Sequence, residues 1–321
     1  MNGLISENGL SRAACIESVA AGRPIVHCIT NFVTVNDCAN IILAAGGSPT
    51  MSRHPAEVQE ITSGCSALVL NMGTISDVEA MILAGKKANE LGHPVILDPV
   101  GAGASAFRRD TLKTLLNEVH FTAIRGNATE IRYLYDGSGL EKGGVDAALS
   151  DSITRDNLTS WGALAQRLAK RLDTVICISG AIDIAADSAS AYAFPGGSPL
   201  MSRITGSGCM LTALMGAFLG GWFEENRQKA SGSDNSQNGT QIRQASAAGS
   251  QSSLQMLTPF DYVIAAQAEM NAAGEIAAAK TEQAGGGTMT FRMHLIDAVS
   301  LMTGGLLNEY AKVEKVPLCD L

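Results

Sequence analysis

The chain has 321 residues, of which 46% are hydrophobic and 17% charged, and its 23 basic and 31 acidic residues give a formal net charge of −8 at pH 7. This composition excludes an intrinsically disordered chain, because such chains combine low hydrophobicity with high charge. The acidic balance, without any Lys/Arg-rich run, argues against nucleic acid or an anionic membrane as a partner. We therefore expect a soluble, folded protein.

The seven cysteines are scattered, with no Cys-x-x-Cys pair, so the sequence predicts neither a disulfide framework nor a zinc site. The first 23 residues carry charges and no uninterrupted apolar run, which is unlike a secretory signal. Both observations favour a cytoplasmic location. The 34 glycines exceed the usual share of roughly 7% and predict tight turns or places where the backbone closely approaches something.

Short apolar runs alternate with helical patterns along the chain, which predicts βα units around a largely parallel sheet. Continuously apolar strands such as VILD indicate burial on both faces. Strands are predicted at 25–29, 67–71, 94–98, 121–125 and 174–179, followed by a meander through 183–187 and 191–195. Helices are predicted near 33–45, 55–63, 76–91, 107–118, 127–135 and 157–171, and then at 205–224, 258–281 and 288–310.

Two stretches bear on the domain organisation. Residues 226–255 are rich in Ser, Gln, Gly and Asn and lack aromatics, which predicts a disordered or mobile surface insertion, with a functional lid as the alternative. Residues 204–223 carry no charge and have the length of a membrane span, but Gly, Ser and Thr fill their first third, so a buried helix is preferred. No linker divides the chain, and we predict a single domain over 1–321.

The ends of the predicted strands are the expected ligand site, because open α/β sheets bind ligands beyond the carboxyl ends of their strands. Polar residues or glycines follow every one of these strands. They include Asn31 after the first strand, Asn71 and Gly73 after the second, Asp98, Gly101 and Gly103 after the third, Arg125, Asn127 and Glu130 after the fourth, and Ser179 after the fifth.

The strongest local signal is the turn TGSGC, which leads into the uncharged helix. Its glycines let several N–H groups converge, and the helix start adds the positive end of a dipole, which predicts an anion hole at Gly206, Ser207 and Gly208. Phosphate is the expected ligand of this site. The alternative interpretation of the motif is a simple tight turn before a helix. A thiol in the first helical turn is expected to have its pKa lowered from about 8.5, so Cys209 is a candidate weak general base for a substrate hydroxyl.

Three further residues suit phosphate chemistry. Asp98 at a strand end and Glu130 at a helix start could hold Mg²⁺ directly or through water. A capping box between Asn127 and Glu130 is the simpler interpretation of that pair, and both can hold together. Arg125 could clamp a phosphate through paired hydrogen bonds, the alternative being a surface ion pair.

A dinucleotide site is the competing interpretation, because residues 101–106 satisfy the relaxed fingerprint G-x-G-x-x-A. That fingerprint needs an acidic residue about twenty positions later. Arg125 occupies this position, and the motif follows the third strand rather than the first, so the interpretation is rejected. Elsewhere, His27 is expected to be a hydrogen-bonded structural histidine, and Met51 would suit an apolar wall against a small heterocycle.

Several motifs together resemble the hydroxyethylthiazole kinase family, which is ribokinase-like. They are VHCITNFVTVNDCANIILAAGGSPTMS, LVLNMGT, VILDPVGAGAS with the following Phe-Arg, IRGNATEI, ISGAID and PLMSRITGSGCMLTALMGAFL. The resemblance covers most of the chain in order but leaves out the first ten residues and residues 226–255. It implies a three-layer α/β/α sandwich with a mostly parallel sheet and no separate lid domain.

The resemblance also implies a reaction, namely phosphorylation of the hydroxyl of 4-methyl-5-(2-hydroxyethyl)thiazole by ATP with Mg²⁺, in thiamine biosynthesis or salvage. A kinase of another small heterocycle such as hydroxymethylpyrimidine, or a non-catalytic binding relative, stays open. A homotrimer with sites at the subunit boundaries is implied as well. Matched by motif, Arg125 and Ser179 (often Thr in the family) are implied for ATP, and Met51 and Gly206 for the thiazole. Asn127 and Glu130 match an N-x-x-E motif linked to Mg²⁺, and Cys209 stands where related sugar kinases carry a catalytic Asp. We further assign Asn127 to ATP, Asn31 to the thiazole and Asp98 to the metal.

Overall fold

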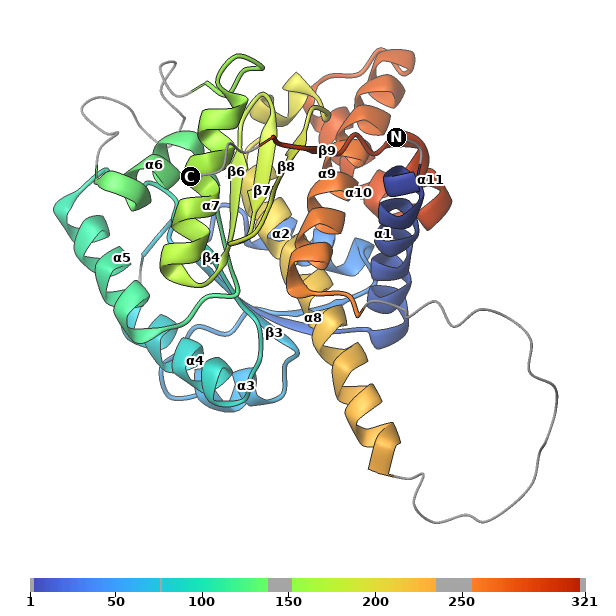
Figure 1. The fold of residues 1–321 in the computed structure, drawn as a ribbon. Helices are drawn as coiled ribbons and strands as arrows, with labels where there is room; N and C mark the ends of the chain where they lie inside the picture. Colours follow the sequence, from blue (N-terminus) through green and yellow to red (C-terminus); the bar gives the residue numbers. More distant parts are fainter. Residues whose placement is uncertain (1–2, 76, 138–151, 235–255, 318–321) are drawn as a thin grey trace, which may run out of the picture.

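The computed structural model describes residues 3–75, 77–137, 152–234 and 256–317. These residues form one nine-stranded sheet in the order β2-β1-β3-β4-β5-β6-β7-β8-β9 (Figure 1). Pairing is parallel from β2 to β6 and antiparallel from β6 to β9. The strands are β1 (Ile25–Ile29), β2 (Ser48–Thr50), β3 (Ala67–Asn71), β4 (Val95–Asp98), β5 (Ala123–Asn127), β6 (Val175–Ser179), β7 (Asp183–Ala186), β8 (Ala191–Phe194) and β9 (Glu314–Lys315).

Helices cover both faces of the sheet, and successive strand residues alternate between two apolar cores. In β3, Val69 belongs to one core, and Leu68 and Leu70 to the other. The first face carries α1 (Gly3–Gly22), α2 (Val35–Ala44), α8 (Ser207–Asp234), α9 (Pro259–Gln283), α10 (Thr288–Ser300) and α11 (Gly304–Tyr310). The second carries α3 (Val58–Ser63), α4 (Val78–Glu90), α5 (Ala106–Glu118), α6 (Ala128–Asp136) and α7 (Leu158–Leu172).

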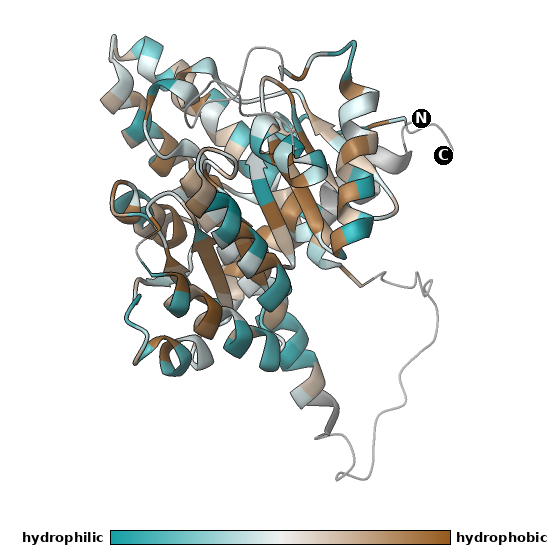
Figure 2. Cartoon of the chain, turned by 90° about the vertical axis from the view of Figure 1, so that its left-hand side faces the viewer, coloured by the Kyte–Doolittle hydropathy of each residue, from teal (hydrophilic) through white to brown (hydrophobic). Residues whose placement is uncertain are grey.

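This arrangement confirms the predicted three-layer α/β/α sandwich with a mostly parallel sheet. Figure 2 shows hydrophobic strands in the interior and hydrophilic residues on the outer sides of the helices in front of them. The strands predicted at 25–29 and 67–71 have the same bounds in the structure. The described ranges hold this one sheet and its two helical layers.

Helix α8 contains most of the uncharged segment, and it lies against the sheet with every residue from Met210 to Leu219 buried, Gly216 included. A Cβ at Gly216 would lie 2.7 Å from Val69 Cγ2 and 2.9 Å from Val26 Cγ1, so the helix backbone rests directly on β1 and β3. The interpretation as a buried helix is confirmed. Among the helices of the described residues, none has the length and hydropathy that crossing a membrane requires.

Several predicted bounds are corrected by the structure. β5 covers 123–127 instead of 121–125, because Arg125, Gly126 and Asn127 pair with β6 despite their low strand propensity. Arg125 therefore lies inside a strand and Asn127 ends it. The predicted helix 288–310 is broken after Ser300, because the Thr303 side chain accepts a hydrogen bond from Leu306 N and starts α11.

Other elements were missed or extended. α1, β2 and β9 were not predicted. The insertion predicted at about 226–255 is wrong for its first nine residues, because α8 continues as a helix to Asp234. Residues 235–255, the remainder of that prediction, lie outside the described residues.

Substitution of Gly216 by Ala is expected to lower the free energy of unfolding by about 1–3 kcal/mol, because the added methyl group would overlap Val69 and Val26. Gly305→Ala is the matched control, since its Cβ would have no neighbour closer than 4.0 Å and Ala favours the helix. Urea denaturation of both variants checks this. Equal stability of Gly216→Ala and the parent would contradict direct contact between α8 and the sheet.

Candidate functional site

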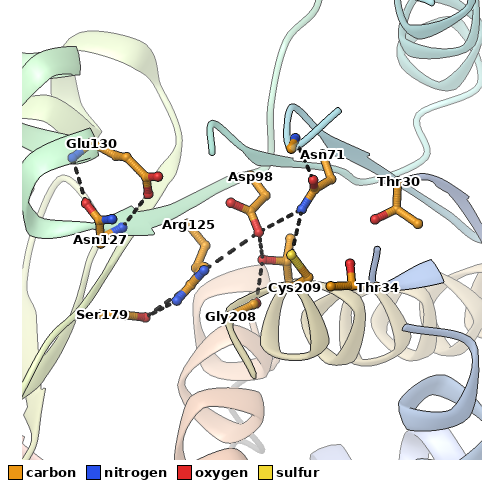
Figure 3. A network of polar contacts seen from close by, with 12 residues as sticks. Thr30, Thr34, Asn71, Asp98, Arg125, Asn127, Glu130, Ser179, Gly208 and Cys209 are labelled. Carbon is orange, nitrogen blue, oxygen red and sulfur yellow. Dashed lines mark hydrogen bonds and ion pairs between the residues drawn. The ribbon is translucent and has the colours of Figure 1, made fainter. Parts of the chain in front are cut away.

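The candidate site lies where the carboxyl ends of the parallel strands meet the start of α8 (Figure 3). Strand register places Asn71 of β3 beside Asp98 of β4, and Asn127 of β5 beside Ser179 of β6. Polar residues that are 27 to 54 positions apart in sequence thus share one edge, as the strand ends predicted.

Asp98 is the centre of this polar network, and its side chain is completely buried. Its Oδ2 accepts hydrogen bonds from Asn71 Nδ2 at 3.0 Å and from Thr212 Oγ1 at 2.8 Å, and Arg125 Nη1 lies 3.7 Å away. Burial raises the pKa of Asp98, and Arg125, Thr212 and Asn71 oppose this. Its Oδ1 is buried without a hydrogen-bond partner among the described residues, so this oxygen has hydrogen-bonding capacity that those residues leave unused.

Cys209 sits in the first turn of α8, half-buried, with its sulfur within reach of two amide groups. Asn71 Nδ2 donates to Sγ at 3.3 Å and Asn31 Nδ2 at 3.5 Å. Nevertheless, burial and the neighbouring Asp98 raise the pKa of the Cys209 thiol above its ordinary value. The prediction that the helix start lowers this pKa is therefore wrong: desolvation and a nearby carboxylate outweigh the local dipole.

Asn31 and Asn71 form a rigid amide pair beside the sulfur. Asn31 Nδ2 donates to Asn71 Oδ1 at 3.0 Å, and that oxygen also accepts from Gly73 N at 2.8 Å. Asn31 Oδ1 accepts from the backbone N–H groups of Val33 and Thr34, both at 3.1 Å. These bonds fix both amide orientations, so the N–H groups point at Cys209.

The glycines of the turn are required by close approaches on both sides. Gly206 has φ +83°, and a Cβ there would lie 2.6 Å from Thr34 Cγ2, at the start of α2. A Cβ at Gly208 would collide with the guanidinium of Arg125. Ser207 is the first residue of α8. The turn therefore brings the helix start and an arginine together, which a simple tight turn would not do.

Arg125 is held by Ser179 of the neighbouring strand, whose Oγ accepts from Nε at 3.1 Å and from Nη2 at 2.6 Å. The Arg125 side chain is 11% exposed and its charge faces the buried Asp98. The alternative of a surface ion pair is thereby excluded. The guanidinium is fixed at the edge of the anion turn, next to Gly208.

Asn127 and Glu130 form the capping box of α6. Asn127 Oδ1 accepts from Glu130 N at 2.9 Å, and Glu130 Oε2 accepts from Asn127 N at 2.8 Å. Glu130 Oε1 also accepts from Gly101 N at 2.8 Å, which ties the loop after β4 to α6. Burial and the nearby Asp98 raise the pKa of Glu130 to about 7. The structure confirms the predicted capping box. Glu130 also lies near Asp98, and magnesium binding by these two carboxylates stays a prediction.

The remaining candidates lie apart from this centre. Met51 follows β2 and packs half-buried against the apolar core, with β1 and β3 between its strand and β4. His27 is buried between Thr62 Oγ1 at 2.9 Å and the Ser52 carbonyl at 2.8 Å, as expected of a structural histidine.

Three contributors were not assigned a role from the sequence. Thr212 lies one turn beyond Cys209 on α8, so helical spacing could have revealed it. Asn71 ends a strand but was not singled out from the other strand ends. Arg108 donates to the carbonyls of Met72, Val100 and Gly73 and so joins the loops after β3 and β4, with no local signal to mark it.

Comparisons with known proteins match most of the chain to one family. The model of the hydroxyethylthiazole kinase family matches residues 16–257. The hydroxyethylthiazole kinase of Desulfovibrio desulfuricans is 44% identical over 308 residues, which cover 95% of this chain and 99% of that protein. That of Clostridium acetobutylicum is 40% identical over 301 residues, covering 93% and 97%.

Solved structures agree as well. The hydroxyethylthiazole kinase protein of Pyrococcus horikoshii OT3 superposes with a TM-score of 0.73 at 28% identity, covering 95% of this chain and 99% of that one. A ribokinase-like superfamily protein of Enterococcus faecalis V583 gives a TM-score of 0.52 at 10% identity, covering 87% and 88%. The second likeness concerns the fold alone and confirms a ribokinase-like architecture.

The Cys209 thiol is expected to react with iodoacetamide mainly at alkaline pH, because burial and Asp98 disfavour the thiolate. Asp98→Asn should shift the pH–rate profile of alkylation to lower pH, and Arg125→Gln should shift it to higher pH, because the two charges act in opposite directions. Mass spectrometry of the Cys209 peptide measures the rates. Shifts in the same direction for both variants would contradict this electrostatic account.

Proposed function

The chain belongs to the hydroxyethylthiazole kinase family, and from that membership we propose that its site transfers the γ-phosphoryl group of ATP to the hydroxyl of 4-methyl-5-(2-hydroxyethyl)thiazole. One observation carries the proposal for this chain. The glycine turn at the start of α8 lies against the Arg125 guanidinium, with the sulfur of Cys209 one residue further along. The backbone N–H groups of the turn, the Arg125 guanidinium and the Cys209 sulfur thus lie next to one another.

The nucleotide side of the site is assigned to Arg125, Ser179 and Asn127. Ser179 holds the edge of the guanidinium formed by Nε and Nη2, so phosphate oxygens would approach Nη1, which faces Gly208 and lies 3.7 Å from Asp98 Oδ2. Phosphoryl transfer passes through a loose transition state with charge spread over the phosphoryl oxygens. The N–H groups of Gly206, Ser207 and Gly208 would stabilise that charge without reorganisation.

The acceptor side is assigned to Asn31, Met51 and Gly206, with Cys209 as the group that takes the hydroxyl proton. Two amide donors face its sulfur and favour the thiolate, although burial keeps the thiol form dominant at neutral pH. A small thiolate fraction suffices, because a loose transition state deprotonates the nucleophile late. Cys209 is therefore a weak base whose contribution grows with pH.

The carboxylates of Asp98 and Glu130 fit a water-mediated magnesium site. Asp98 Oδ1 is buried and lacks a partner among the described residues, and Glu130 lies close enough for the Asp98 charge to raise its pKa. The described residues hold no group of three His, Cys, Asp or Glu side chains suited to a metal. Mg²⁺ commonly takes one or two carboxylates together with waters and phosphates. When bound, it would neutralise phosphate charge.

The substrate is tested by measuring ADP release with the thiazole alcohol, with hydroxymethylpyrimidine and with no acceptor. We expect turnover with the thiazole alcohol at least tenfold above the other two arms. Preference for the pyrimidine would identify a kinase of another heterocycle. Release equal to the acceptor-free arm in all cases, with ATP still bound, would overturn the proposal in favour of a binding protein.

The base is tested by two substitutions of Cys209. Cys209→Ala is expected to lower kcat about tenfold or more, because no side chain then accepts the proton. Cys209→Asp should preserve kcat at pH 7 and remove the rise of kcat with pH that the thiol imposes. The pH profile of kcat for the parent and both variants checks this, and equal profiles for Cys209→Ala and the parent would remove the sulfur from the mechanism.

We propose further that the chain forms a cytoplasmic homotrimer with its sites at the subunit boundaries. Six free cysteines among the described residues support a reducing location. Phe32 and Val33, directly after the site residue Asn31, are 70% and 53% exposed, and a second copy would cover them.

The trimer is tested by light scattering after gel filtration, with an expected mass of three times 33.3 kDa. Phe32→Asp should lower this mass, because it places a charge in the proposed interface. Phe107→Asp, at a 58% exposed position on α5, is the matched control and should leave it unchanged. A parent of monomeric mass would contradict the proposal.

A further inference from the structure

A third carboxylate lies beside the anion turn and has no place in the chemistry proposed above. Asp37, in the first turn of α2, is 3% exposed. Its Oδ2 lies 3.9 Å from the position that a Cβ of Gly206 would occupy. Thr34, which starts the same helix, packs its methyl group against that glycine. The start of α2 and the turn are therefore in direct contact.

A negative charge at this position weakens the binding of an anion by the turn. A phosphoryl group held by the Gly206 to Gly208 amides would feel the negative charge of Asp37 with little solvent between them, because the buried position limits screening. Asp37 gains stability from its place in the first turn of α2, where the helix dipole favours an acid. The carboxylate therefore lies next to the anion site, and a neighbouring cation is needed to balance it.

Arg292 of α10 supplies that balance. Its Nε donates to Asp37 Oδ1 at 2.6 Å, and its Nη2 donates to the same oxygen. The two residues are 255 positions apart in sequence. α10 also contacts η2 (Pro199–Arg203), the short helix that leads into the turn. The arginine thus reaches the carboxylate from an element that packs against both sides of the anion site.

We propose that Arg292 is a positioning residue that neutralises Asp37 and thereby keeps the turn at Gly206 able to hold an anion. Neither side chain needs to touch the substrate. The inference rests on the proposed function only in taking this turn as a phosphate site. A purely structural link between α2 and α10 is the alternative, and it makes a different prediction, because removing either partner breaks such a link and the double variant does not restore it.

The test compares Arg292→Gln, Asp37→Asn and the double variant with the parent, by ATP affinity in calorimetry and by kcat/KM for ATP. Arg292→Gln should lower both at least tenfold, because it leaves the carboxylate unbalanced. Asp37→Asn should stay within about threefold of the parent, and the double variant should recover to the same level. Lys86→Gln, which breaks an ion pair with Glu118 between α4 and α5, is the control and should change neither.

Loss in Asp37→Asn as large as in Arg292→Gln, without recovery in the double variant, would overturn the proposal and leave the structural link. Urea denaturation of each variant shows whether a loss of ATP affinity comes from unfolding. If Arg292→Gln does not fold, Arg292→Lys takes its place in the test: it keeps the positive charge and should keep the ATP affinity of the parent. ATP binding is measured without an acceptor. Failure of the parent to phosphorylate the thiazole alcohol would therefore contradict the proposed function while leaving this comparison intact.

Discussion

The site depends on one buried charge, the carboxylate of Asp98 at the carboxyl end of β4. A buried charge without partners costs several kcal/mol, so its neighbours must supply donors and a cation. Asn71 comes from β3, Thr212 from α8 and Arg125 from β5. Satisfying this one carboxylate therefore places three elements relative to one another, and the helix that carries Thr212 brings Cys209 with it.

The second constraint is steric and acts on the same helix. α8 can place its first turn beside β4 only because Gly216 lets its backbone rest on Val69 and Val26 further along. At its start, Gly208 leaves space for the Arg125 guanidinium. The glycines of this region thus meet two different needs. Gly216 allows a close helix–sheet contact, whereas Gly206 and Gly208 shape the anion turn.

The features predicted correctly are those that depend on residues close together in the chain. β1 and β3 were located because apolar runs bounded by polar residues are a local signal, and the capping box of Asn127 was read from spacing alone. The pKa of Cys209 was predicted in the wrong direction because the nearby Asp98, 111 residues away in sequence, and burial outweigh the helix start. Arg125 was placed at a strand end because its pairing with β6 is a tertiary effect.

Charge balance connects these observations. Three buried carboxylates belong to the site or its supporting contacts, and each is compensated differently. Asp98 has Arg125 and two uncharged donors, and Asp37 has Arg292. Glu130 accepts from two backbone N–H groups, and its pKa is raised to about 7. Arg125 also faces the turn, so a bound polyanion would compete with Asp98 for it. The magnesium ion proposed at Asp98 and Glu130 would then supply the positive charge that Arg125 no longer gives to Asp98.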